Sequence, residues 1–171
     1  MELGLTFPLQ RFVKVKAPPC GAEADCRLCW DLHVICLRGR KCLLAVHCRS
    51  RYAFVRYDVP PLQWADIPGL FREGLRDSLT ASGFSEDQIR GYLRRAEDIH
   101  ITCTHGRREV AYLNRAWEDV LALDLCLDTT GQPQLLLDHA VNTRPSRCAG
   151  FDGLGLALER MAVTLEEGAI P

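Results

Sequence analysis

The sequence predicts an α+β fold, an antiparallel sheet built from two β-hairpin or meander units with helices packed on one side. Short runs rich in β-forming residues follow one another across residues 29–59, with glycine and proline between them. Apolar residues then recur at helical spacing across residues 66–97. Because strand and helix signals come in blocks and do not alternate strictly, the pattern favours α+β over a parallel α/β sheet.

The first 59 residues are expected to form a strand, a loop and a meander. A strand is predicted near residues 5–15, and the loop "KAPPCGAEADC" completes an N-terminal segment of residues 1–28. The meander at 29–59 has the strands "CWDLHVICL", "KCLLAVHC" and "YAFVRYDV", with a turn at Gly39 and an end at Pro60.

A helix pair is predicted over residues 66–97. Asp66 can cap the first helix, with Pro68 in its first turn, and Gly83 ends it. Ser85 and Gln88 have the spacing of a capping box at the start of the second helix.

The last third is expected to contain a second hairpin and then helices. "IHITCT" and "EVAYL" are predicted to pair across "HGRR", which gives a hairpin at 99–113. Asn114 is expected to cap the first of the C-terminal helices, which fill residues 114–167.

Length and charge bound the class of protein. A chain of 171 residues is expected to form one domain, 1–171. The net charge of −1 provides no basic field, so nucleic acid is not the expected partner. The start has no basic, apolar leader, and no run is long enough for a membrane helix, so we expect a soluble cytoplasmic protein with reduced thiols.

The cysteines near the start of the meander are the candidate metal ligands. Cys26 and Cys29 have the Cys-x-x-Cys spacing with which two thiolates bind one zinc ion, and Cys20 would be a third ligand. A structural zinc site normally has four ligands, and a lone Cys-x-x-Cys is a weak signal. No cofactor is therefore predicted. The alternatives for these cysteines are a zinc site and a redox-active or labile disulfide pair.

Other cysteines are interpreted mainly as core residues. Cys36, Cys42 and Cys48 lie among leucine and valine, where cysteine behaves as a small hydrophobe. Cys103 and His105 would share a strand face, so a catalytic Cys–His pair is the alternative there. Arginines near the strand ends predict a solvated fringe or a rim for single-stranded nucleic acid: Arg38, Arg40, Arg49, Arg51 and Arg56.

Several segments together resemble an uncharacterised bacterial family of domains of unknown function. The resemblance covers residues 30–165, with a tryptophan strand, a basic turn with Lys-Cys, a helix pair, a Thr-to-Asn segment and an Asn-x-Arg-Pro motif. The matching residues are Trp30, Lys41, Cys42, Gly83, Ser85, Glu86, Thr104, Arg108, Val110, Asn114, Asn142, Arg144 and Pro145. The family pattern has asparagine where His33 stands, and Cys20, Cys26 and Cys29 are not part of it. The resemblance implies a compact domain without an assigned reaction.

Three functions are compatible with these observations. The preferred one is a non-enzymatic binding or regulatory module that acts through a protein partner, with Trp30, Lys41, Arg108 and Asn114 as candidate binding residues. The first alternative is a thiol- or zinc-dependent enzyme, and the second is a single-stranded nucleic-acid binder. The enzyme hypothesis predicts convergence of at least two of the following: Cys20, Cys26, Cys29, Cys42, Cys48, Cys103, His47 and His105.

Overall fold

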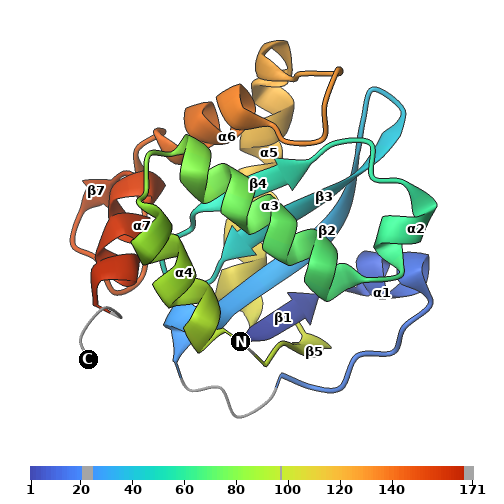
Figure 1. Ribbon diagram of the computed structural model, residues 1–171, viewed down its shortest axis with the longest axis horizontal. Helices are drawn as coiled ribbons and strands as arrows, with labels where there is room; N and C mark the ends of the chain where they lie inside the picture. The colour runs from blue at the N-terminus through green and yellow to red at the C-terminus, as the bar shows by residue number, and fades with distance from the viewer. Residues whose placement is uncertain (21–24, 97, 168–171) are drawn as a thin grey trace.

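A five-stranded mixed sheet forms the centre of the molecule (Figure 1). The computed structural model describes residues 1–20, 25–96 and 98–167. The strands are β1 (Glu2–Leu5), β2 (Cys29–Leu37), β3 (Arg40–His47), β4 (Ala53–Arg56), β5 (His100–Cys103), β6 (Ser146–Arg147) and β7 (Leu154–Gly155). The helices are α1 (Phe7–Val13), α2 (Pro61–Trp64), α3 (Ile67–Ala81), α4 (Glu86–Arg95), α5 (Arg107–Ala122), α6 (Leu135–Asn142) and α7 (Ala157–Glu166), with 3₁₀ turns η1 (Cys26–Leu28) and η2 (Asp124–Cys126).

The α+β class is confirmed, but the sheet is not wholly antiparallel. The order is β4-β3-β2-β1-β5, and β1 runs parallel to both β2 and β5. Strands β2, β3 and β4 form the predicted antiparallel meander. Its first turn is Arg38-Gly39, both with positive φ, as a two-residue hairpin turn requires.

The predicted strand at 5–15 is wrong beyond Leu5, because the chain turns directly into α1. Pro8 lies in the first turn of this helix, a position where its fixed φ favours helix. Lys14, in the left-handed conformation, ends the helix.

The predicted hairpin at 99–113 is also wrong. β5 pairs with β1, whereas "EVAYL" is part of α5 and Asn114 lies inside that helix instead of capping it. The short apolar run "EVAYL" is by itself compatible with either a strand or a helix. Val110, Leu113 and Val120 have helical spacing when they are read together.

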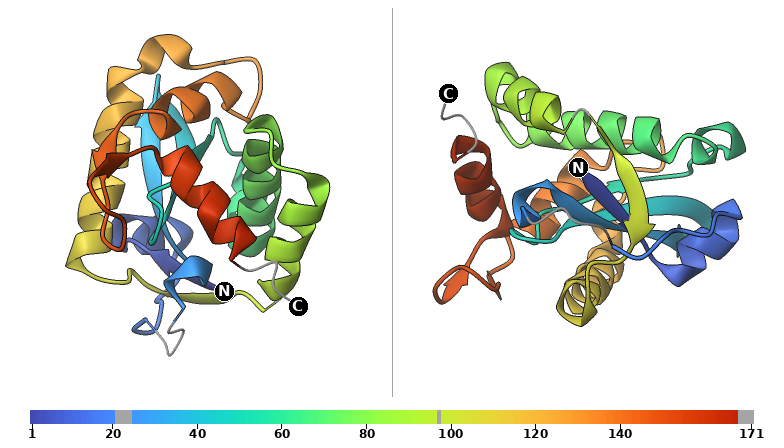
Figure 2. Two further views of the ribbon diagram at one scale, coloured as in Figure 1. Left: turned by 90° about the vertical axis from the view of Figure 1, so that its left-hand side faces the viewer. Right: turned by 90° about the horizontal axis from the view of Figure 1, so that it is seen from below.

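Helices cover both faces of the sheet, which corrects the expectation of one side (Figure 2). One core contains Trp30, Leu32 and Phe54 from the strands with apolar residues of α3, α4 and α7. The other contains Leu44 and Val55 with residues of α5 and α6. Successive strand residues point to opposite faces, and here both sets are apolar, so each face requires a cover.

Side chains of α6 satisfy the outer backbone of β4. Asn142 Oδ1 accepts the Ala53 N–H at 2.8 Å, and Asn142 Nδ2 donates to the Ala53 carbonyl at 2.7 Å. Asp138 Oδ1 accepts the Val55 N–H at 2.9 Å. An edge strand that would otherwise be open to pairing is thereby covered.

The predicted helix pair is confirmed as α3 and α4. Asp66 caps α3, and Ser85 and Gln88 form the capping box of α4. Within the described ranges, no helix combines the length and the apolar character that a bilayer span needs.

Candidate metal centre

A cluster of five potential ligands lies on the sheet face that α5 covers. Trp30 and Leu32 of β2 point into the opposite core, so Cys29 and Asp31 point toward α5. The parallel register places Glu2 of β1 beside Cys29. Two further members come from segments outside the strands, Cys48 after β3 and His105 before α5. Register and alternation thus bring residues far apart in sequence to one place.

Gly4 makes room for this cluster. Its register partner in β2 is Asp31. A Cβ at residue 4 would overlap the Asp31 carboxylate and lie 2.9 Å from both His105 Nδ1 and the Thr104 Cα. Real Cβ atoms do not approach neighbours that closely, so the His105 loop can rest on β1 only because residue 4 has no side chain.

Asp31 orients His105. Its Oδ1 lies 2.7 Å from His105 Nδ1 and also accepts the backbone N–H of His105 at 3.2 Å. His105 Nε2 then points to Glu2 Oε2 at 3.3 Å. That nitrogen is buried and has no aligned hydrogen bond, and neither has Asp31 Oδ2. Asp31 Oδ2 thus has no hydrogen bond among the described residues, while His105 Nε2 has the ion-pair contact with Glu2, an arrangement that a bound ion would complete.

The electrostatics of the cluster favour a cation. Burial alone would lower the pKa of His105, but the Asp31 and Glu2 carboxylates outweigh it and raise that pKa above its ordinary value. Burial raises the pKa of Asp31, with His105 opposing it. Glu2 is 5 % exposed and Asp31 is 1 % exposed, so both carboxylates are largely screened from water. Positive charge on the imidazole compensates them in the absence of any other cation.

Two sets of ligand atoms converge on His105. Glu2, Cys29 and His105 place one atom each within 4.8 Å of one another, and so do Asp31, Cys48 and His105. Carboxylate, thiolate and imidazole together are donors that suit zinc. A metal in the second set would displace the Asp31 hydrogen bond from Nδ1. A metal bound by Glu2, Cys29 and His105 Nε2 would keep the hydrogen bond between Asp31 and Nδ1.

The three predicted cysteine ligands have different environments. Cys29 is buried in the cluster, whereas Cys20 and Cys26 are exposed. Among the residues that the structure describes, neither Cys20 nor Cys26 belongs to a group of three close ligands. Strand register, not the Cys-x-x-Cys spacing, determines the neighbours of Cys29.

The predicted binding residues lie in four different places. Trp30 is fully buried, and its Nε1 donates to the Tyr92 hydroxyl at 2.9 Å, so it is a core residue. Lys41 is exposed, with its ammonium 5.9 Å from the centre of the Phe12 ring. Arg108 pairs with the neighbouring Glu109 at 2.6 Å, and Asn114 lines a pocket beside α1.

Glu2 and Asp31 escaped the sequence reasoning, although one signal pointed to Asp31. It is a charged residue inside the apolar run "CWDLHVICL", and a buried charge needs a partner. The partner, His105, lies far away in the sequence and becomes a neighbour only through the fold.

The predicted Cys103–His105 pair is not formed. The Cys103 thiol donates to the Ala17 carbonyl at 3.3 Å, while the His105 ring contacts Asp31. Cys48 Sγ lies 3.5 Å from His105 Nδ1, but burial raises the pKa of this thiol. A thiol that resists deprotonation is a poor nucleophile without a metal ion.

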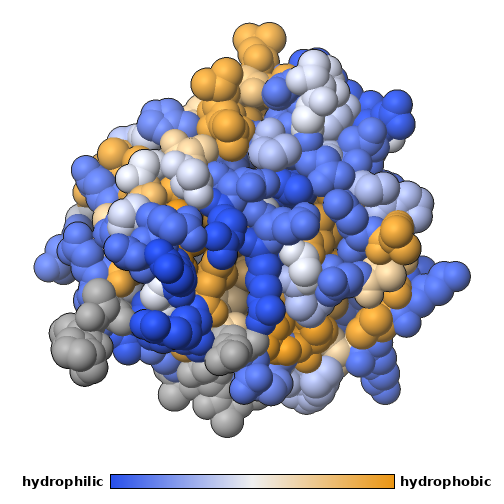
Figure 3. Space-filling model, in the orientation of Figure 1, coloured by the Kyte–Doolittle hydropathy of each residue, from blue (hydrophilic) through white to orange (hydrophobic). Residues whose placement is uncertain are grey.

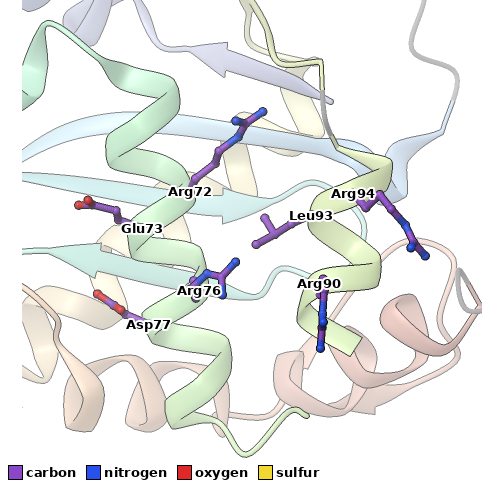
Figure 4. A pocket seen from close by; sticks show the side chains of 7 residues that line it. All are labelled: Arg72, Glu73, Arg76, Asp77, Arg90, Leu93 and Arg94. Atoms are coloured by element: carbon purple, nitrogen blue, oxygen red, sulfur yellow. The ribbon is translucent and has the colours of Figure 1, made fainter. Parts of the chain in front are cut away.

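A cleft of about 690 Å³ between α3 and α4 is lined by Arg72, Arg76, Arg90 and Arg94 around Leu93 (Figure 4). Two of these arginines pair with carboxylates, Arg76 with Glu86 at 2.9 Å and Arg90 with Asp87 at 2.8 Å. Glu73 and Asp77 of α3 also line this cleft, and they contact the buried Arg56. Much of the positive charge around this cleft is therefore compensated within the molecule.

The arginines of the first sheet are also engaged. Arg38, Arg40, Arg49 and Arg56 each pair with a carboxylate. Arg51 stacks over the Tyr112 ring at 4.8 Å and donates to the Arg147 carbonyl at 2.7 Å. This set makes intramolecular contacts, which leaves less charge for a nucleic-acid strand.

Comparison with known proteins identifies a family. The family model described as "Domain of unknown function (DUF6933)" matches residues 2–153. This span contains all five residues of the cluster. No curated protein matches the chain. The resemblance to a family of domains of unknown function is thereby confirmed.

Proposed function

The chain belongs to the DUF6933 family, and from that premise we propose that it is a metal-dependent binding module without catalytic chemistry of its own. A divalent transition-metal ion, zinc by its ligand preference, binds to His105 Nε2, a Glu2 carboxylate oxygen and the Cys29 thiolate. A water molecule or a group from a partner completes the coordination.

The contact between Asp31 and His105 carries the proposal. A metal-bound histidine usually donates its other ring N–H to a carboxylate, which fixes the tautomer and the ring orientation. When a metal replaces the proton on Nε2, the 2.7 Å contact from Nδ1 to Asp31 would hold the remaining proton on Nδ1 and direct Nε2 toward the ion beside Glu2. The 3.3 Å contact between Nε2 and Glu2 supports the same assignment, because it places the two proposed ligand atoms side by side.

Burial supports a structural or regulatory role over catalysis. Cys29 is 3 % exposed and Glu2 is 5 % exposed, so a substrate would have little access to a metal between them. The ion would join β1, β2 and the segment before α5, three parts of the chain that are distant in sequence. Occupancy would then control the stability of this end of the sheet, because an ion that binds only the folded state stabilises it.

Cobalt spectroscopy with four variants, two of which are matched Cys→Ser substitutions, tests the ligand set. We expect native mass spectrometry to find one zinc or cobalt ion per chain, and cobalt to produce a thiolate charge-transfer absorption. Cys29→Ser should abolish that absorption, and His105→Gln should prevent binding. Cys48→Ser should retain metal binding and the charge-transfer absorption, because the Cys48 thiol lies beside Nδ1 of His105 and the proposed metal binds at Nε2. Asp31→Asn should weaken binding about 10- to 100-fold by releasing the ring.

Two results would contradict the proposal. A chain that retains no metal in excess zinc or cobalt would leave the cluster as a buried hydrogen-bonded network. Loss of the absorption in Cys48→Ser but not in Cys29→Ser would assign the metal to the Asp31 side of the ring.

Exposed leucines support a protein as the partner of the module. They lie on α5, η2 and α6, elements that contact one another, and Figure 3 shows apolar atoms gathered at this end of the molecule. The leucines are Leu121, Leu125, Leu135 and Leu136, of which Leu125 is 98 % exposed and Leu136 is 74 % exposed. Exposed apolar patches of this kind are typical of protein interaction sites.

Affinity purification with a matched variant tests this second role. The double variant Leu125→Asp, Leu136→Asp should keep the fold, because both side chains are exposed, and should lose the proteins that copurify with the unmodified chain. Identical sets of copurified proteins would contradict a role of this patch.

A further inference from the structure

A second site lies between the start of α1, the middle of β2 and α5. It is a pocket of about 520 Å³, a size typical of small-molecule sites. Phe7, Val34 and Trp117 contribute to its apolar lining, and His33, Thr104 and Asn114 are polar. We propose that this pocket binds an uncharged, planar heteroaromatic molecule of nucleobase size.

Aromatic side chains form accessible walls. Phe7 is 69 % exposed and Trp117 is 37 % exposed, so both rings of the lining are accessible. Trp117 packs edge-on against the His33 ring, with 5.3 Å between the ring centres. Rings held in this way provide flat surfaces for a flat ligand, and an aromatic ligand would remove them from water.

Polar groups with spare hydrogen-bonding capacity also face this pocket. His33 Nδ1 contacts the Thr6 hydroxyl at 2.8 Å, which leaves Nε2 without a protein partner among the described residues. The Asn114 amide and the Thr104 hydroxyl likewise make no hydrogen bond within the described ranges. An imidazole and an amide can each donate or accept, so they fit the mixed edge of a heteroaromatic ring.

Charge excludes the ionic alternatives. Among the residues that the structure describes, no Lys, Arg, Asp or Glu side chain lines the pocket. Burial lowers the pKa of His33, which favours the neutral ring. A charged ligand would lose its hydration here without gaining an ion pair.

The pocket and the metal centre are separate sites. Thr104 is the chain neighbour of His105, but none of the proposed metal ligands lines the pocket. Binding measured in the presence of a chelator therefore tests the pocket alone, and its failure would leave the metal proposal untouched.

Tryptophan fluorescence offers a direct measurement. Trp30 is fully buried and Trp64 is 7 % exposed, so a pocket ligand should change mainly the emission of Trp117. The probes are adenine and benzimidazole, with cyclohexanol as a non-aromatic comparison. We expect saturable quenching by both aromatic probes, confirmed by calorimetry, and no comparable binding of cyclohexanol.

Variants on one helix provide the controls. Asn114→Ala should weaken binding of adenine about three- to tenfold, the effect of one lost hydrogen bond. Trp117→Leu should abolish the fluorescence change and weaken calorimetric binding. Glu118→Gln, next to Trp117 on α5 but outside the pocket, should bind as the unmodified chain does. Absence of saturable binding by both aromatic probes, or binding that neither pocket variant alters, would overturn the proposal.

Discussion

His105 Nδ1 and Asp31 Oδ1 lie 2.7 Å apart over a residue that has no side chain. Gly4 is the register partner of Asp31, and the His105 loop approaches the sheet directly above it. The contact therefore depends on three segments at once, β1, β2 and the connection from β5 to α5.

Gly4→Ala should destabilise the protein and disturb the cluster. The added methyl group would meet Asp31, His105 and Thr104, and forced overpacking of this kind typically costs about 1–3 kcal/mol. Chemical denaturation would measure this loss, and metal binding should weaken in the same variant because the His105 ring must move.

Gly91→Ala is the matched control. A Cβ at Gly91 in α4 would meet nothing within 4 Å. Since alanine is the better helix former, this variant should be more stable by about 0.5–1 kcal/mol. Equal effects of the two substitutions would contradict the steric role of Gly4.

Asp138 should make stability depend on pH. Burial raises the pKa of Asp138 from 3.8 to about 8, so the folded state holds a proton that the unfolded state releases. The contribution of this group is present below pH 3.8 and is lost as pH rises toward 8. The free energy of unfolding should therefore fall by up to about 1.4 kcal/mol per pH unit in this window.

Asp138→Asn isolates that dependence. Asparagine can still accept the Val55 N–H and can donate to Ser78, whose hydroxyl lies 3.0 Å from Asp138 Oδ2. Urea denaturation from pH 5 to pH 8 should show that the free energy of unfolding depends less on pH in the variant. The other titrating groups are common to both proteins, so the difference between the two profiles reports Asp138. Parallel profiles would contradict the assignment.

His47 should give the free energy of unfolding the opposite pH dependence, and it should do so at lower pH. Burial lowers its pKa from 6.5 to about 4, and the ring contacts the Arg27 carbonyl and Ser50 as a neutral imidazole. The unfolded state takes up the proton first, so stability is lost as pH falls from 6.5 to about 4. The total loss is on the order of 3 kcal/mol.

His47→Gln should lack this acid dependence. The comparison concerns the slope of unfolding free energy against pH between 6.5 and 4, not its offset, because the substitution also alters packing. If the two slopes were the same, another group would be responsible.

Asn142→Ala should open the edge of the sheet. The variant leaves the backbone N–H and carbonyl of Ala53 without their partners in a fully buried site. Each unsatisfied buried group costs about 1–3 kcal/mol. Thermal unfolding would measure the loss, and light scattering should detect self-association through β4. Asn114→Ala, at an exposed asparagine inside α5, should not lower stability, because alanine is the better helix former. Similar losses in both variants would contradict the role of Asn142.

Local signals predicted much of the fold. Asp66, Ser85 and Gln88 identified the starts of α3 and α4, because a cap is formed by residues a few positions apart. "EVAYL" was assigned to a strand because five residues are too few to distinguish the two periods. The parallel pairing of β1 could not be predicted, since no local pattern specifies a partner so far along the chain.

The difference between local signals and long-range pairing also explains which residues of the candidate site could be predicted. Cys29, Cys48 and His105 were recognised by residue type as candidate ligands or catalytic residues, and the structure brings them into one cluster. Glu2 and Asp31 required the register of β1 against β2. The Cys-x-x-Cys spacing pointed to Cys26, which is exposed, because spacing alone does not describe how a strand presents its side chains.

The position of β1 has a consequence for biosynthesis. It leaves the ribosome before both of its partner strands, since its Glu2 pairs with Cys29 on one side and with His100 on the other. The sheet cannot close until the segment through Cys103 has been translated, and contacts between distant residues slow folding. Until then, the nascent chain exposes an unpaired strand edge to other nascent chains and to chaperones.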